Sequence, residues 1–175
     1  MRRIAACAAL VAFAATATSC GYRLAGANAN PSIPASLKVV AVIPFENQTK
    51  RPEIEQRVTE EVARELSKRG GYDVVTDRDT ADALLEGAVI GFETSPVQFN
   101  DQGRATRVET VVRLRATLRD VRSGNPMWSQ DGLVFREQYD VDENEASFFD
   151  RETLALDELA RGAAGALVAS IFEGF

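Results

Sequence analysis

The sequence contains no histidine and only two cysteines, Cys7 and Cys20, among its 175 residues. Histidine is the side chain most often used as a general base and as a metal ligand. Its absence excludes serine–histidine catalytic triads and zinc sites built from cysteine and histidine. Asp77, Asp79 and Asp82 alternate loosely, but this stretch lacks the glycine and the final glutamate of a calcium-binding loop. The sequence therefore predicts a protein that is not an enzyme and that needs no metal or cofactor.

Long hydrophobic runs are also missing. The run at residues 4–17 is mostly alanine and is shorter than the roughly 18 to 20 apolar residues that a bilayer-spanning helix needs. It follows Arg2 and Arg3 and ends in small residues, which is the pattern of a secretory signal peptide. We therefore expect residues 1–19 to be removed on export. Cys7 is then lost, so no disulfide can form within the remaining chain.

The four residues Ala17-Thr18-Ser19-Cys20 resemble the lipobox of bacterial lipoproteins. Small residues precede the cysteine as in that motif, while Ala17 stands where the motif usually has leucine. The resemblance implies cleavage before Cys20 and acylation of its sulfur and of its new amino group. Each buried methylene contributes about 0.8 kcal/mol, so two or three acyl chains would hold the protein stably on a membrane. Ordinary secretion without a lipid is the alternative.

Acidic residues outnumber basic ones by 26 to 20, and the net charge of −6 becomes −8 once Arg2 and Arg3 leave with the signal peptide. A negatively charged chain repels the phosphate backbone of nucleic acids. The composition therefore argues against a nucleic-acid partner.

The mature chain divides into a tether and one domain. Residues 20–36 are rich in glycine, alanine, asparagine and proline and show no periodicity, so we expect a lipidated N-terminal tether there. Residues 37–175 are then a single domain, long enough to bury a sizeable core.

Two segments of this domain have helical periodicity. Apolar residues recur every four positions over residues 54–66, which predicts an amphipathic helix that begins near Pro52 and stops before a pair of glycines. A second helix is predicted over residues 148–172. Gly162 and Gly165 would let this helix approach a sheet closely, at a cost of about 1 kcal/mol each in helix propensity.

Strands are predicted from β-branched runs and from apolar–polar alternation. The clearest alternation covers residues 106–119, and the polar residues 95–105 before it predict a hairpin loop. Gly87 and Gly91 inside the preceding strand indicate a bulge or the close approach of another element. The predicted strands span residues 37–43, 72–76, 84–94, 106–119 and 127–139.

The predicted element order is therefore β-α-β-β-β-β-α. The run at residues 37–43 has no polar face, which indicates a central or parallel strand. The later strands follow one another as an antiparallel meander. We expect an α+β fold, a two-layer α/β sandwich in which two helices cover one face of a mixed, mainly antiparallel sheet of about four to five strands.

Several stretches resemble the LptE family of lipopolysaccharide-assembly lipoproteins, and together they cover nearly all of the mature chain. The most specific is Cys-Gly-Tyr-Arg-Leu-Ala-Gly at residues 20–26. The stretches at residues 42–47 and 81–87 also resemble curli-secretion lipoproteins and lipoprotein activators of penicillin-binding proteins. The remaining stretches are residues 52–55 and the Met127-Trp128 hairpin.

The LptE resemblance implies a periplasm-facing lipoprotein, anchored in the inner leaflet of the outer membrane. Such a protein plugs an LptD-type β-barrel, assists its assembly, and with it places lipopolysaccharide in the outer leaflet, without a covalent reaction. Gly21, rather than aspartate, after Cys20 is consistent with outer-membrane sorting. The implied partners are the barrel, lipopolysaccharide and the membrane. The alternative is another lipoprotein interaction module, either an activator of a penicillin-binding protein or a subunit of a curli-type secretion pore.

Six arginines form the densest basic cluster of this acidic chain. Lipopolysaccharide carries phosphates and carboxylates, which the planar arginine fork binds through paired hydrogen bonds. The cluster is therefore a candidate contact to lipopolysaccharide or to the barrel, and the alternative is an ordinary solvated sheet face. Its members are Arg113, Arg115 and Arg119 on one face of a strand, Arg104 and Arg107 at the start of that strand, and Arg136 on the next strand.

Phe99 stands in a polar segment and is the aromatic residue that we expect at an exposed partner contact. We expect the other apolar aromatic side chains to pack in the core, with a groove for acyl chains as the alternative. These are Phe92, Trp128, Phe135 and Tyr139. The acidic pairs at residues 60–61 and 157–158 indicate solvated helix faces.

Overall fold

The computed structural model describes residues 30, 33–34, 36–69, 71–141 and 145–173. The expected signal peptide, the lipobox and Cys20 lie outside these residues. Within them the elements follow one another as β1 (Val39–Val42), β2 (Glu46–Asn47), α2 (Ile54–Lys68), β3 (Asp73–Val75), η1 (Arg78–Thr80), β4 (Ala83–Phe99), β5 (Ala105–Asp120), β6 (Pro126–Asp140) and α3 (Glu145–Glu173).

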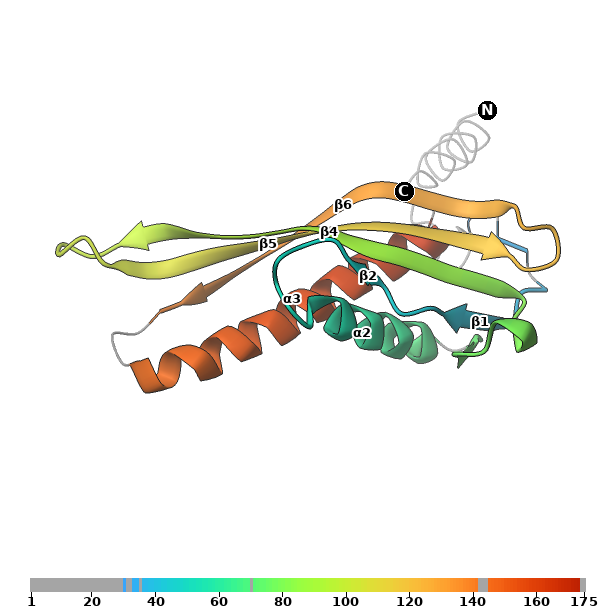
Figure 1. Ribbon diagram of the computed structural model, residues 1–175, viewed down its shortest axis with the longest axis horizontal. Coiled ribbons are helices and arrows are strands. Elements are labelled where there is room, and N and C mark those ends of the chain that lie inside the picture. Colours follow the sequence, from blue (N-terminus) through green and yellow to red (C-terminus); the bar gives the residue numbers. More distant parts are fainter. Residues whose placement is uncertain (1–29, 31–32, 35, 70, 142–144, 174–175) are drawn as a thin grey trace, which may run out of the picture.

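The strands form one mixed sheet in the order β3-β1-β4-β5-β6, with the short β2 pairing with β4. β1 is parallel to both β3 and β4, whereas β4, β5 and β6 are antiparallel. Figure 1 shows α2 and α3 side by side on one face of the sheet. The α+β class, the mixed sheet and the two helices on one face confirm the sequence prediction. The sheet has six strands rather than four to five because the two-residue β2 was not predicted.

Helix α2 is held by one apolar stripe. Ile54, Val58, Val62 and Leu66 are all buried at 1% exposure or less. Burying side chains of this size contributes about 1.5 to 3 kcal/mol each. The helix begins two residues after Pro52, because Glu53 has a φ of 64°, in the left-handed region that cannot continue a right-handed helix.

Helix α3 packs a stripe of small and large apolar residues against the sheet and α2. Its buried residues include Leu159, Ala163 and Leu167. Gly162 lets the ring of Phe135 on β6 approach the helix so closely that a Cβ atom would overlap it. Gly165 has open space around it. The prediction that the glycines let the helix approach the sheet closely is therefore confirmed for Gly162 and wrong for Gly165.

Strand β4 continues to Phe99, so the hairpin loop predicted at residues 95–105 is wrong. Residues 94–99 contain threonine, valine and phenylalanine, which favour strands, and they pair with the start of β5. The actual loop is held by the Asn100 carboxamide oxygen, which accepts from the backbone N–H groups of Gln102 and Arg104. The polar residues led to the prediction of a loop because this part of β4 is exposed instead of lying over the core.

Residues 93–111, the end of β4 and the start of β5, form a hairpin that we call the arm, and β6 pairs with its β5 strand from Arg107 onward. In Figure 1 the arm reaches beyond the start of α3, at one end of the long axis. The glycines predicted to mark irregularities lie just before it. Gly91 follows a register shift in the β4–β5 pairing. A Cβ atom at Gly87 would lie 2.6 Å from the Phe45 ring and 2.7 Å from the Arg115 carbonyl oxygen.

Candidate functional site

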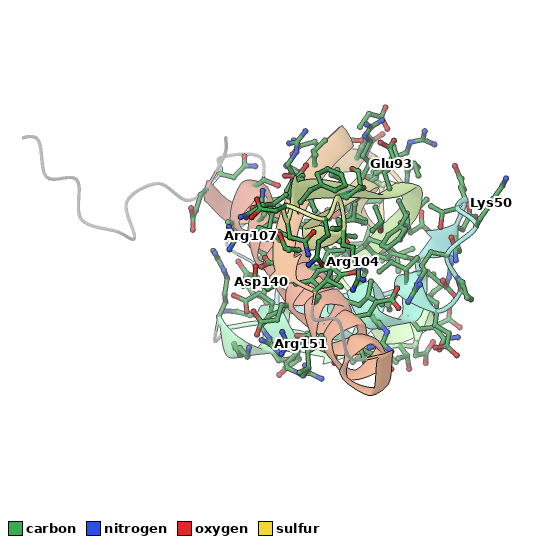
Figure 2. All side chains as sticks on the ribbon, turned by 90° about the vertical axis from the view of Figure 1, so that its left-hand side faces the viewer. Lys50, Glu93, Arg104, Arg107, Asp140 and Arg151 are labelled. Atoms are coloured by element: carbon green, nitrogen blue, oxygen red, sulfur yellow. The ribbon has the colours of Figure 1, made fainter. Side chains whose placement is uncertain are left out.

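The face of the sheet opposite the helices carries most of the predicted arginine cluster. Alternate residues of β5 such as Val112 and Leu114 are buried under the helices, so their neighbours point to the opposite face. Arg113 and Arg115 are exposed there. Arg107 lies nearer the arm tip on the same strand, and the loop residue Arg104 appears with it at the arm end in Figure 2.

Acidic side chains from neighbouring strands accompany these arginines. Figure 2 shows one of them, Asp140, beside Arg107. We call the set the charge ladder, and it consists of Arg113–Glu93 at 3.4 Å, Arg115–Asp131 at 2.7 Å, Arg107–Asp140 at 2.8 Å and Arg136–Glu109 at 3.9 Å. Of the two cluster members outside the ladder, Arg119 donates to the Gly124 carbonyl at 2.9 Å, and Arg104 lies in the loop at the arm tip. The face is therefore charge-balanced, which sequence reasoning missed because the acidic partners appear only once the strand register is known.

One ion pair of the ladder, Arg107–Asp140, shifts the ionisation of both its members. The bond from the Arg107 guanidinium lowers the pKa of Asp140, and its positive charge adds to the effect. The same bond raises the pKa of Arg107. Both groups are fully charged near neutral pH. Because such exposed pairs are only weakly bound, an arginine can exchange its carboxylate for a phosphate or carboxylate of a partner.

Three of the four aromatic residues predicted to pack in the core do so, and Phe99 is exposed as predicted. Phe92, Trp128 and Phe135 pack against the hydrophobic core. Tyr139 is half-buried, and this burial, with the nearby Glu152 carboxylate, raises its pKa. Phe99 is 57% exposed at the end of the arm, and Val97 beside it is 47% exposed. The arm tip therefore presents apolar surface next to a polar, charge-balanced face.

Asp82 has a structural partner. Its carboxylate oxygen accepts from the backbone N–H groups of Lys38 and Val39, each at 3.0 Å. These hydrogen bonds lower its pKa. Over the described ranges no group of three or more acidic, cysteine or histidine side chains is placed to hold a metal ion.

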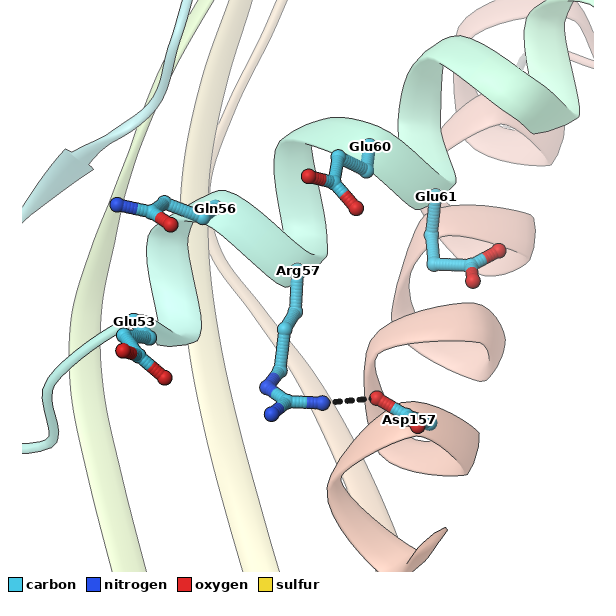
Figure 3. A pocket seen from close by; sticks show the side chains of 6 residues that line it. All are labelled: Glu53, Gln56, Arg57, Glu60, Glu61 and Asp157. Atoms are coloured by element: carbon cyan, nitrogen blue, oxygen red, sulfur yellow. Dashed lines mark hydrogen bonds and ion pairs between the residues drawn. The ribbon is translucent and has the colours of Figure 1, made fainter. Parts of the chain in front are cut away.

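A polar pocket of about 260 Å³ lies between α2 and α3 and is drawn in Figure 3. Arg57 reaches across it from α2 to Asp157 on α3, and the two form an ion pair. Glu61 is only 9% exposed and pairs with Arg64, so it does not lie on a solvated helix face as the sequence predicts. Part of the pocket is therefore occupied by the Arg57–Asp157 ion pair, which spans it. It is lined by Glu53, Gln56, Arg57, Glu60, Glu61 and Asp157.

Across residues 30–173, outside the gaps in the description, no helix has both the length and the apolar character of a membrane span. The helices of the described domain thus give no transmembrane candidate.

Solved structures with the same fold include several bacterial lipoproteins. A solution structure of lipoprotein B from Nitrosomonas europaea has a TM-score of 0.57, 16% identity, and covers 86% of this chain and 90% of that chain. The PelC dodecamer from Paraburkholderia phytofirmans has a TM-score of 0.52, 20% identity, and covers 82% and 92%. A putative lipoprotein from Caulobacter crescentus has a TM-score of 0.51, 15% identity, and covers 74% and 86%. At these identities the likeness establishes the shared fold alone.

The comparison of sequences identifies the family as well as the fold. No curated protein matches the chain significantly. Residues 37–171, which include every strand and nearly all of α3, match the LptE family, described as lipopolysaccharide-assembly. This is a family of assembly proteins rather than of enzymes, and the match confirms the resemblance drawn from the short sequence stretches. The chain therefore belongs to the LptE family of lipopolysaccharide-assembly lipoproteins.

Proposed function

We propose that this protein is acylated at Cys20, sits in the inner leaflet of the outer membrane facing the periplasm, and plugs an LptD-type β-barrel. In this role it assists assembly of the barrel and takes part in moving lipopolysaccharide to the outer leaflet. The observation that carries the proposal is the family match over residues 37–171. The same proposal divides the chain into a signal peptide at residues 1–19, a lipidated tether at residues 20–36 and a single domain at residues 37–175.

The charge ladder supports a plug. Large β-barrels have polar interiors, so a protein inside one must present a polar surface to the wall. The outer face of β4, β5 and β6 is polar, and its positive and negative charges alternate instead of forming one strongly charged field. A surface of this kind can exchange its own ion pairs for pairs with the barrel wall.

The arginines of the ladder are also the proposed contacts to lipopolysaccharide. Arg113 and Arg115 lie on adjacent outward positions of β5 with about half of each side chain exposed. Their carboxylate partners are more exposed still, at 64% and 78%, so water already competes for them. A lipopolysaccharide phosphate, which accepts paired hydrogen bonds from arginine, can replace such a carboxylate.

Depletion of the protein from living cells tests this function. We expect less lipopolysaccharide at the cell surface and less correctly folded barrel, with wild-type protein restoring both. A Cys20→Ala variant is expected to restore less, because the protein would lose its membrane anchor. Normal surface lipopolysaccharide together with a defect in cell-wall synthesis or in fibre secretion would contradict the proposal and favour the other lipoprotein modules.

A further inference from the structure

The N-terminal segment is fixed to the C-terminal end of α3 through Asn30. The Asn30 side-chain amide donates to the Ile171 carbonyl at 2.9 Å, and its backbone N–H donates to the Phe172 carbonyl at 3.0 Å. The last carbonyls of a helix have no partner within the helix. Asn30 thus caps α3 from a position 141 residues earlier in the chain.

Neighbouring contacts reinforce this attachment. Ile33 packs against the hydrophobic core, and its N–H donates to the Asn30 carbonyl. Leu37 is only 5% exposed. The rings of Tyr72 and Phe172 stack with their centroids 4.6 Å apart, which holds the capped end of α3 against the β3 edge of the domain. The chain is therefore bound to the domain at Asn30, Ile33 and Leu37, before β1 begins.

Strand β5 joins two opposite ends of the molecule. Its first residue, Ala105, pairs with Phe99 at the arm tip. Two residues beyond its last residue, Asp120, lies Arg122, which lines a small pocket together with Pro34 and Leu37 of the N-terminal segment. The 16 residues of β5, at about 3.3 Å each, place these ends roughly 50 Å apart. Figure 1 shows the arm tip and the β5–β6 turn at opposite ends of the long axis.

A lipid on Cys20 cannot reach the arm tip while Asn30 is held. The ten residues from Cys20 to Asn30, fully extended, span at most about 36 Å. Helix α3, whose far end Asn30 caps, has 29 residues and is about 43 Å long by itself. The arm extends further still beyond the start of α3. The anchor therefore stays near the end that carries Asn30 and Arg122.

We propose that Asn30 is a positioning residue that holds the acyl anchor at one end of the domain, so that the arm tip is the part that enters the partner barrel. Phe99 and Val97 then form the contact deepest in the barrel, and their exposed apolar surface is available for it. This inference rests on the proposed plug function, because it names which end of the plug enters the barrel first.

Photo-crosslinking in the outer membrane tests the orientation. A photoreactive amino acid replaces Phe99 in one variant and Arg122 in a matched control, both in the full-length protein. Both positions are exposed, the Arg122 side chain at 88%, and each flanks a hairpin turn. We expect Phe99 to crosslink to the co-purified barrel, with at least tenfold less product from Arg122.

The opposite pattern, or a barrel that co-purifies without crosslinking to Phe99, would overturn the orientation and leave the plug function standing. Absence of a barrel in the purification would overturn the plug function itself. The Asn30→Ala variant, which loses the side-chain bond and keeps the backbone one, is expected to lower the Phe99 crosslinking yield several-fold. An unchanged yield would overturn the positioning role of Asn30, whatever its effect on thermal stability.

Discussion

Asp82 and Val39 are joined by two reciprocal hydrogen bonds at the start of the β1–β4 pair. The Asp82 carboxylate accepts from the Val39 N–H at 3.0 Å, and the Val39 carbonyl accepts from the Asp82 N–H at 2.9 Å. The carboxylate also accepts from the Lys38 N–H. The aspartate of the Ala-Asp-x-Leu stretch therefore fixes the register of the parallel strands, a structural role that sequence reasoning did not assign to it.

Replacing Asp82 should make stability depend on pH in a defined direction. The folded state lowers the pKa of Asp82 below its ordinary value of 3.8. The stability that the ionised Asp82 carboxylate adds to the fold is therefore fully present above about pH 4, and it is lost as the pH falls through the lowered pKa. We expect Asp82→Asn to lower the melting temperature at neutral pH, and this difference should shrink below about pH 3. The exposed Asp79→Asn is the control and should shift stability by less than about 0.5 kcal/mol. A difference between wild type and Asp82→Asn that grows on acidification would contradict this account.

Alanine substitutions at two glycines of α3, one helical turn apart, should change the free energy of unfolding in opposite directions. At Gly165 there is open space, so alanine should stabilise the protein by up to about 1 kcal/mol through helix propensity. At Gly162 the methyl group would overlap the ring of Phe135, and overpacking of this kind costs about 1 to 3 kcal/mol. Urea unfolding of the two variants measures both effects. Equal shifts would show that the helix does not approach β6 at Gly162.

The charge ladder should matter for partner binding more than for stability. The double variant Arg113→Gln/Arg115→Gln removes two exposed ion pairs, each worth about 1 kcal/mol or less. We expect nearly unchanged unfolding but at least tenfold weaker association with the barrel or with purified lipopolysaccharide. Arg78→Gln, which also breaks an exposed pair, serves as the control. Unchanged association would identify the ladder as an ordinary solvated sheet face.

Substitutions at Phe99 and at Phe135 should separate an effect on partner binding from an effect on folding stability. Phe99→Ser alters a side chain that is already 57% exposed, so the melting temperature should hold while barrel association weakens. Phe135→Ala removes a ring packed against the core and should cost about 2 kcal/mol of unfolding free energy. Thermal unfolding and co-purification of both variants provide the comparison. A loss of stability in Phe99→Ser would mean that the arm tip packs on the domain.

Sequence periodicity predicted the elements that bury a continuous apolar face. The four-residue repeat from Ile54 to Leu66 and the alternation in residues 106–119 each correspond to an observed element. The outer part of β4 was missed because residues 95–99 are exposed, so no burial pattern marks them as a strand. Strand β2 was missed because two exposed residues, Glu46 and Asn47, carry no periodicity at all.

The candidate site, like the fold, was predicted from the sequence only in part. Alternation alone predicted that Arg113 and Arg115 share one face. Their partners Glu93 and Asp131 come from two other strands, and the register shift at Leu114/Arg115 decides which residue of β6 faces Arg115. Local patterns carry no information about such a shift. The balanced charge of the face therefore required the structure.

Affinity purification of the lipidated protein from detergent-solubilised outer membranes, with mass spectrometry of the bound partners, tests the central claim most directly. We expect one large β-barrel in stoichiometric amount with the wild-type protein, and less of it with the Arg113→Gln/Arg115→Gln variant. A penicillin-binding protein without a barrel, or a ring made only of copies of this chain, would contradict it.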